Sequence, residues 1–85
     1  MVKITEVLNG SYADKVGIKP NDMLISVNSN AINDVLDYRF YIMEPRLVLT
    51  VTRNGQEMTF VINKEEYDDI GLEFSNNRRS GWQVR

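Results

Sequence analysis

The side chains of this 85-residue chain that could do chemistry are mostly carboxylates, because the chain contains no histidine and no cysteine. The lack of cysteine excludes disulfides, thiolate metal sites and cysteine nucleophiles within the chain. The lack of histidine removes the commonest general base and the commonest metal ligand. Asp34 and Asp37 have the spacing of a carboxylate pair, but no third ligand or phosphate-binding glycine loop accompanies them. We therefore expect no catalytic residue, metal or cofactor, and assign both acids to a helix N-terminus.

The densest charge lies in four acids just ahead of an Ile-Gly-Leu: Glu65, Glu66, Asp68 and Asp69. A glycine between two aliphatic residues after such a loop has two interpretations. In the first, it is a turn that leads into a last strand. In the second, it belongs to a loop whose free backbone amides hold a ligand. Period-two alternation points Ile70, Leu72 and Phe74 to one side of that strand. These three side chains then either fill the interior or line an apolar groove.

The composition is that of one small globular domain, with 42% hydrophobic and 26% charged residues. No apolar run is long enough to span a membrane, and no N-terminal stretch has the pattern of a signal peptide. We expect a cytoplasmic protein with no membrane partner. Residues 1–74 carry seven basic and twelve acidic groups. This acidity argues against nucleic-acid binding and favours a neutral or basic partner.

Local signals predict the order of elements along the chain. The alternating residues 2–7 predict a strand, and Ser11 with Asp14 predicts the N-terminus of a short helix that Gly17 ends. Residues 23–27 predict a second strand with a short return. The pair Asn54-Gly55 between alternating segments predicts a hairpin with a type I′ turn.

A longer helix is predicted over residues 35–43, because Glu44-Pro45 stops it. Leu36, Phe40 and Met43 are spaced i, i+4 and i+7, and we expect them to face the core. Asp37, Tyr38 and Tyr41 then lie toward another side. The whole order predicts a small α+β domain over residues 1–75, with a mostly antiparallel sheet and two helices. Residues 76–85 have no period and are predicted to be a flexible tail.

The spacing of the first half resembles the PDZ-domain family. The residues that carry the resemblance are Gly10-Ser11-x-Ala13-x-x-x-Gly17-Ile18-x-Pro20-x-Asp22-x-Leu24-x-x-Val27-Asn28. They match the family pattern GSPAxxAGLxxGDxILxVNG, except that Asn21 replaces the glycine of the turn and Ser29 the glycine after Val-Asn. The resemblance implies a five- to six-stranded sheet or partial barrel capped by two helices.

A closer resemblance is to the N-terminal PDZ-like domain of a domain-of-unknown-function family of radical-SAM-type iron–sulfur proteins. It is carried by the opening MVKITEV, by Ile32-x-Asp34-x-x-Asp37-Tyr38, and by Gly71-Leu72-Glu73-Phe74. In those proteins a cysteine-rich segment follows, whereas SNNRRSGWQVR follows here. An excised domain with a foreign tail is one explanation for the difference, and a wrong closer assignment is the other.

The PDZ resemblance implies that an x-φ-G-φ loop precedes the strand to which a peptide adds. The matching segment here is Asp69-Ile70-Gly71-Leu72, at the far end from its usual place, so a circularly permuted order is implied. The resemblance then assigns the peptide-binding residues, which lie on this loop, on the strand 72–75 and on helix 35–43: Asp69, Ile70, Gly71, Leu72, Glu73, Phe74, Asp37, Tyr38 and Tyr41.

The leading hypothesis is a non-catalytic module that binds an extended peptide or an internal protein segment. The acids beside the loop disfavour a terminal carboxylate, since repulsion there opposes its hydrogen bonds to the amides. The alternative is a docking or positioning domain of a larger radical-SAM-type iron–sulfur enzyme. In that case the groove is filled by the parent chain itself.

Overall fold

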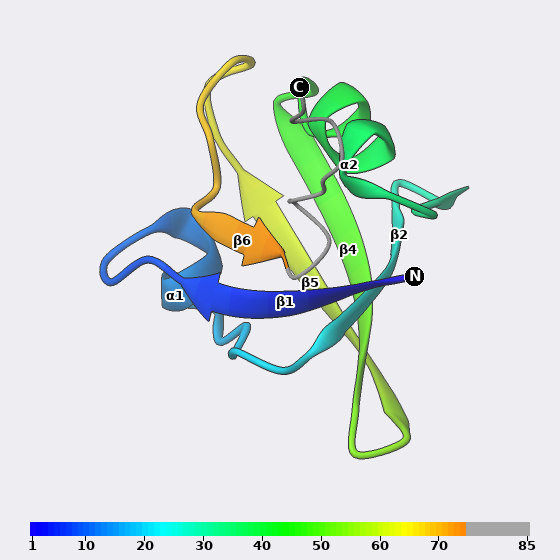
Figure 1. Cartoon of the computed structure of the whole chain (residues 1–85). Helices are drawn as coiled ribbons and strands as arrows, with labels where there is room; N and C mark the ends of the chain where they lie inside the picture. The colour runs from blue at the N-terminus through cyan, green and yellow to red at the C-terminus, as the bar shows by residue number, and fades with distance from the viewer. Residues whose placement is uncertain (75–85) are drawn as a thin grey trace, which may run out of the picture.

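The computed structural model describes residues 1–74. Its strands and helices follow the predicted α+β order (Figure 1): β1 (Val2–Val7), α1 (Tyr12–Val16), β2 (Met23–Val27), β3 (Asn30–Ala31), α2 (Val35–Tyr41), β4 (Arg46–Arg53), β5 (Gln56–Asn63) and β6 (Leu72–Phe74). The α+β fold class is therefore confirmed. The predicted tail 76–85, and residue 75 of the proposed peptide-pairing strand, lie outside the described residues.

The six strands form one open antiparallel sheet in the order β5-β4-β2-β1-β6, and β3 pairs with β2. The last strand lies beside the first, with Ile4 opposite Phe74 and Val7 opposite Leu72. This pairing is the one that a permuted order requires. Consequently β6 is the end of the sheet within residues 1–74, and its outer edge faces no other described strand.

Short-range interactions explain the two ends of α1. The Ser11 hydroxyl accepts a hydrogen bond from the Asp14 amide at 3.2 Å, and the Asp14 carboxylate accepts one from the Gly10 amide at 2.8 Å. Gly17 ends the helix in the left-handed region, at φ 104°, where a residue without Cβ is favoured. Ile18 behind it is completely buried. The predicted cap and stop of this helix are confirmed.

The predicted turns are also confirmed. Asn54 and Gly55 both have positive φ and join β4 to β5, whose register runs without a shift from Arg46–Asn63 to Arg53–Gln56. Asn21 has φ 78° in the turn before β2, and Ser29 has φ 69° in the turn after it. Asparagine and serine therefore adopt here the left-handed conformations for which the PDZ pattern uses glycine.

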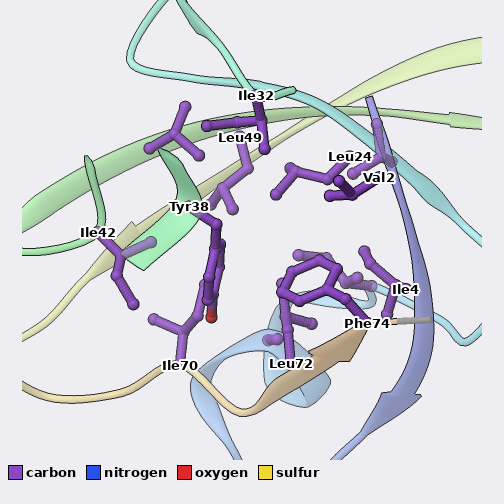
Figure 2. Packing of buried hydrophobic residues seen from close by; sticks show 14 of the residues in the cluster. Val2, Ile4, Leu24, Ile32, Tyr38, Ile42, Leu49, Ile70, Leu72 and Phe74 are labelled. Carbon is purple, nitrogen blue, oxygen red and sulfur yellow. The ribbon is translucent and has the colours of Figure 1, made fainter. Parts of the chain in front are cut away.

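The core lies between the sheet and α2 and contains side chains from every strand except β3. Its buried members are Val2, Ile4, Ala13, Ile18, Leu24, Val27, Ile32, Val35, Tyr38, Ile42, Leu47, Leu49, Val51, Ile62, Ile70, Leu72 and Phe74. Figure 2 shows aromatic and aliphatic side chains of α2, β1, β2, β4 and β6 converging in it. No helix within residues 1–74 is long and apolar enough to cross a bilayer.

The predicted core face of the longer helix is wrong. Leu36 and Phe40 are 71% and 65% exposed, and Met43 is also exposed. The helix instead buries Val35 and Tyr38, and Ile42 just after its last residue. Both sets of residues have helical spacing, so periodicity alone did not distinguish them. The helix is also two residues shorter than predicted, because it ends at Tyr41.

Candidate functional site

The acidic loop ahead of β6 is organised by one buried lysine and by contacts with α1. Lys64 donates hydrogen bonds from Nζ to the carbonyl oxygens of Glu65 and Glu66, at 3.0 and 2.6 Å. Tyr12 donates from its hydroxyl to an Asp68 carboxylate oxygen at 3.0 Å. This bond raises the pKa of Tyr12, because ionisation would remove the donated proton. The loop is therefore held at both its start and its middle.

The Ile70-Gly71 segment uses its carbonyl groups to bind α1 and the turn ahead of it. The Ala13 amide donates to the Ile70 carbonyl at 3.0 Å, and the Leu8 amide donates to the Gly71 carbonyl at 2.9 Å. Gly71 has φ +92°, and a Cβ placed on it would collide with the side chain of Ser11. The glycine is thus required for close packing against the N-cap of α1 as well as for the turn into β6.

The helix α2 and the strand β6 touch through two aromatic rings. The centroids of Tyr38 and Phe74 are 4.6 Å apart and the rings are inclined by 66°, an edge-to-face arrangement. Ile70 and Leu72 lie beside this pair (Figure 2). All four side chains are buried. They fill the space between helix and strand and have almost no surface that a ligand could contact.

The hydroxyl of Tyr38 is buried and has no hydrogen-bond partner within residues 1–74. It points from α2 toward Ile70 (Figure 2). Burial raises the pKa of Tyr38 far above its ordinary value, and the nearby charge of Asp69 raises it further. A protein oxygen therefore already lies at the loop that was expected to present amides.

The residues assigned to peptide binding divide into two groups in the structure. Tyr38, Ile70, Gly71, Leu72 and Phe74 are buried together. The others reach the surface: Asp37, Tyr41, Asp69 and Glu73. Their roles toward a peptide remain predictions.

Asp37 and Tyr41 have partners within or beside α2. The Asp37 carboxylate accepts a hydrogen bond from the Asn33 amide at 2.9 Å, and its own amide donates to Asp34 at 3.0 Å. This is a capping arrangement, as predicted for the two acids. Tyr41 packs edge to face on Phe40. Within residues 1–74, no group of three or more acidic side chains is arranged to hold a metal ion.

A pocket of about 440 Å³ opens where the end of α2 meets the acidic loop. Its lining residues come from both elements: Arg39, Ile42, Met43, Glu66, Tyr67, Asp68 and Asp69. The pocket adjoins the start of β6, since Asp69 is three residues before that strand. It combines apolar walls with three carboxylates and one guanidinium.

Comparison with known proteins decides the family. The PDZ domain family model matches residues 3–53, which is more than half of the chain. The chain belongs to the PDZ domain family. The matched residues include both helices, β1 except Val2, and β2 to β4, and they end before β5, the acidic loop and β6.

This PDZ domain is similar to part of a probable periplasmic serine endoprotease, DegP-like, from Chlamydia pneumoniae. The two are 37% identical over 57 residues, which is 62% of this chain. The chain spans only 12% of the length of that relative. The similarity therefore concerns a domain within a longer protein.

The sequence reasoning missed several pocket residues of this PDZ domain. Arg39 and Tyr67 received no role, and Met43 was expected in the core. The pocket forms because the fold brings residues that are distant in the chain to line one space. Arg39 and Glu66, for example, are 27 positions apart. Only the excess of acids in the loop was visible beforehand.

Proposed function

We propose that this PDZ domain binds an extended peptide or protein segment as an additional strand beside β6, next to α2. The observation that carries the proposal is the position of β6 at the end of the sheet, with no described strand on its outer side. An unpaired edge offers a row of backbone donors and acceptors to an incoming strand. PDZ domains as a family bind peptides or protein segments, and the family match supports this assignment.

The exposed side chains near that edge define what the segment would touch. Glu73 points outward from β6, Asp69 precedes it, and Tyr41 is half-buried on α2. The side chains of Phe74 and Leu72 are buried in the core, so they hold β6 in place and are not themselves part of the contact surface. A short segment with one anchoring side chain binds with a dissociation constant on the order of micromolar.

The test is a titration of the ¹⁵N-labelled domain with a library of six-residue peptides, each as a free acid and as an amide. We expect amide shifts along residues 70–74 and few along β5. The best binder is then N-methylated at its odd residues or at its even residues. Because alternate amides of a strand face its partner, one methylated series should lose binding and the other should keep it. Equal loss or equal retention, or no shifts with any peptide, would refute strand addition.

A second candidate is a docking domain whose edge is covered by another part of its own longer chain. The contact between Tyr38 and Phe74 favours it, because their rings fill the interior between α2 and β6. For this second candidate we propose that the longer chain is a radical-SAM-type iron–sulfur enzyme, on the resemblance described above. We also propose that the protein is cytoplasmic. The discriminating observation is the parent reading frame: a cysteine cluster just downstream supports docking. Tight binding of free peptides to the full parent protein argues against it.

A further inference from the structure

We infer that the pocket between α2 and the acidic loop receives a lysine or arginine side chain of the bound segment. The inference rests on the proposed strand addition and adds to it the chemistry of the anchoring residue. In an antiparallel pairing, the C-terminal end of the segment lies at the start of β6. That end lies beside the pocket, since Glu66 to Asp69 lead directly into β6.

The walls of the pocket suit the aliphatic stem of a long basic side chain. Ile42 is nearly buried, whereas Met43 and Tyr67 have exposed apolar surface. These three residues provide contacts for methylene groups while the charged end stays in water. The volume of about 440 Å³ is sufficient for one such side chain.

The charges of the pocket favour a cation. Glu66, Asp68 and Asp69 line it together with Arg39 alone of the basic residues. Within residues 1–74 the only ion pair joins Arg53 and Asp22, and neither of them lines the pocket. The ammonium group of Lys64 hydrogen-bonds to carbonyl oxygens of the loop and neutralises no carboxylate by direct pairing. An incoming carboxylate therefore meets an excess of negative charge.

The Tyr38 hydroxyl gives a second, independent reason to disfavour a terminal carboxylate. It is buried without a partner and points toward Ile70, in the loop ahead of β6 (Figure 2). A carboxylate that reached the loop from that side would have to displace a side chain held in the core by Phe74. A basic side chain in the pocket needs no such displacement.

The experiment compares matched peptides on the folded domain. The probes are acetyl-Ser-Thr-Val-Thr-Val-X amides in which X is lysine, norleucine or glutamate, and the lysine peptide as a free acid. We expect the lysine amide to bind about fivefold tighter than the norleucine amide, as an exposed ion pair allows. The glutamate amide and the free acid should bind more weakly than the lysine amide. About 1 M salt should remove most of the preference, because the Debye length falls to about 3 Å.

Matched variants locate the effect. Asp69→Asn and Glu66→Gln should each reduce the lysine preference, taken as the ratio of the norleucine to the lysine dissociation constant, toward one. Glu57→Gln removes an equal charge from β5, away from the pocket, and should change nothing. Arg39→Gln should increase the lysine preference, because it removes the one cation of the lining.

Equal binding of the lysine and norleucine peptides would overturn this inference and leave strand addition intact. A free acid that binds best, and that Arg39→Gln weakens, would overturn it in favour of carboxylate recognition. No binding of any peptide would overturn the inference together with the proposed function.

Discussion

The aromatic rings of Tyr38 and Phe74 meet edge to face with their centroids 4.6 Å apart, and this contact joins the helix α2 to the last strand of the sheet. Phe74 lies 36 residues after Tyr38 in the chain, so the contact has a high loop-closure cost. Its burial offsets that cost and positions β6 beside α2. The candidate peptide edge therefore depends on a core contact that no peptide needs to touch.

The buried Tyr38 hydroxyl yields a prediction about stability. Tyr38→Phe should raise the free energy of unfolding by about 1 kcal/mol, because it removes a buried polar group without a partner and keeps the ring contact. Tyr38→Leu should lower the free energy of unfolding by about 2 kcal/mol, since the aromatic pair and part of the packing are lost. Urea denaturation measures both. A loss of 1 kcal/mol or more in Tyr38→Phe would show that the hydroxyl has a partner.

Gly71 is predicted to be far more sensitive to substitution than Gly10. Both have positive φ, but a Cβ on Gly10 meets no atom within 4 Å, whereas a Cβ on Gly71 collides with Ser11. Gly10→Ala should cost about 1 kcal/mol, from backbone strain alone. Gly71→Ala should cost about 3 kcal/mol, because overpacking adds to that strain.

The collision has a direct test. Ser11→Gly costs only a few tenths of a kcal/mol as an N-cap change, and it removes both atoms that Ala at position 71 would strike. The double variant should therefore be more stable than Gly71→Ala alone, as thermal unfolding would report. Simple additivity of the two losses would show that the collision is not the cause.

The ion pair of Asp22 and Arg53 predicts a loss of stability in acid. Burial by itself raises the pKa of Asp22, but hydrogen bonds from Arg53 at 2.7 and 2.8 Å and from the Lys19 amide outweigh it and hold that pKa below its ordinary value. The folded state thus binds the proton less readily than the unfolded state. This stabilisation is present above the ordinary aspartate pKa of about 3.9 and is lost as pH falls through the lower pKa of the folded state.

Asp22→Ala should accordingly lower the free energy of unfolding at pH 7 by about 2 kcal/mol. The value lies below that for a fully buried pair because the Arg53 side chain is 30% exposed. The variant should also lose the part of the acid dependence below about pH 4 that Asp22 supplies. Denaturant titrations at several pH values measure this. An unchanged acid profile in the variant would assign the dependence to other carboxylates.

The two faces of α2 should respond differently to truncation. Ile42→Ala should cost about 3 kcal/mol, because the side chain is buried in the core. Leu36→Ala should change stability by no more than about 0.5 kcal/mol, because that side chain is 71% exposed. Chemical denaturation of both variants decides the matter. Equal costs would mean that the exposed face of α2 is packed in the intact protein.

The sequence by itself determined the features that depend on neighbours along the chain. The Ser11 cap, the Gly17 stop and the Asn54-Gly55 turn were all predictable, because each rests on the sterics and hydrogen bonds of a few adjacent residues. The spacing of the first half also predicted the PDZ domain, which the family match confirms. The alternation of Ile70, Leu72 and Phe74 was visible, but whether they line a groove or fill the core was not.

Only the tertiary structure decided which face of α2 is buried and what surrounds the acidic loop. The stripe of Leu36, Phe40 and Met43 has good helical spacing, yet the helix turns Tyr38 inward because Phe74 and Ile70 lie opposite. The pocket likewise arises because the fold brings Arg39 and Asp69, 30 positions apart in the chain, to line one space. Burial depends on what packs across the core, and that information lies in residues distant along the chain.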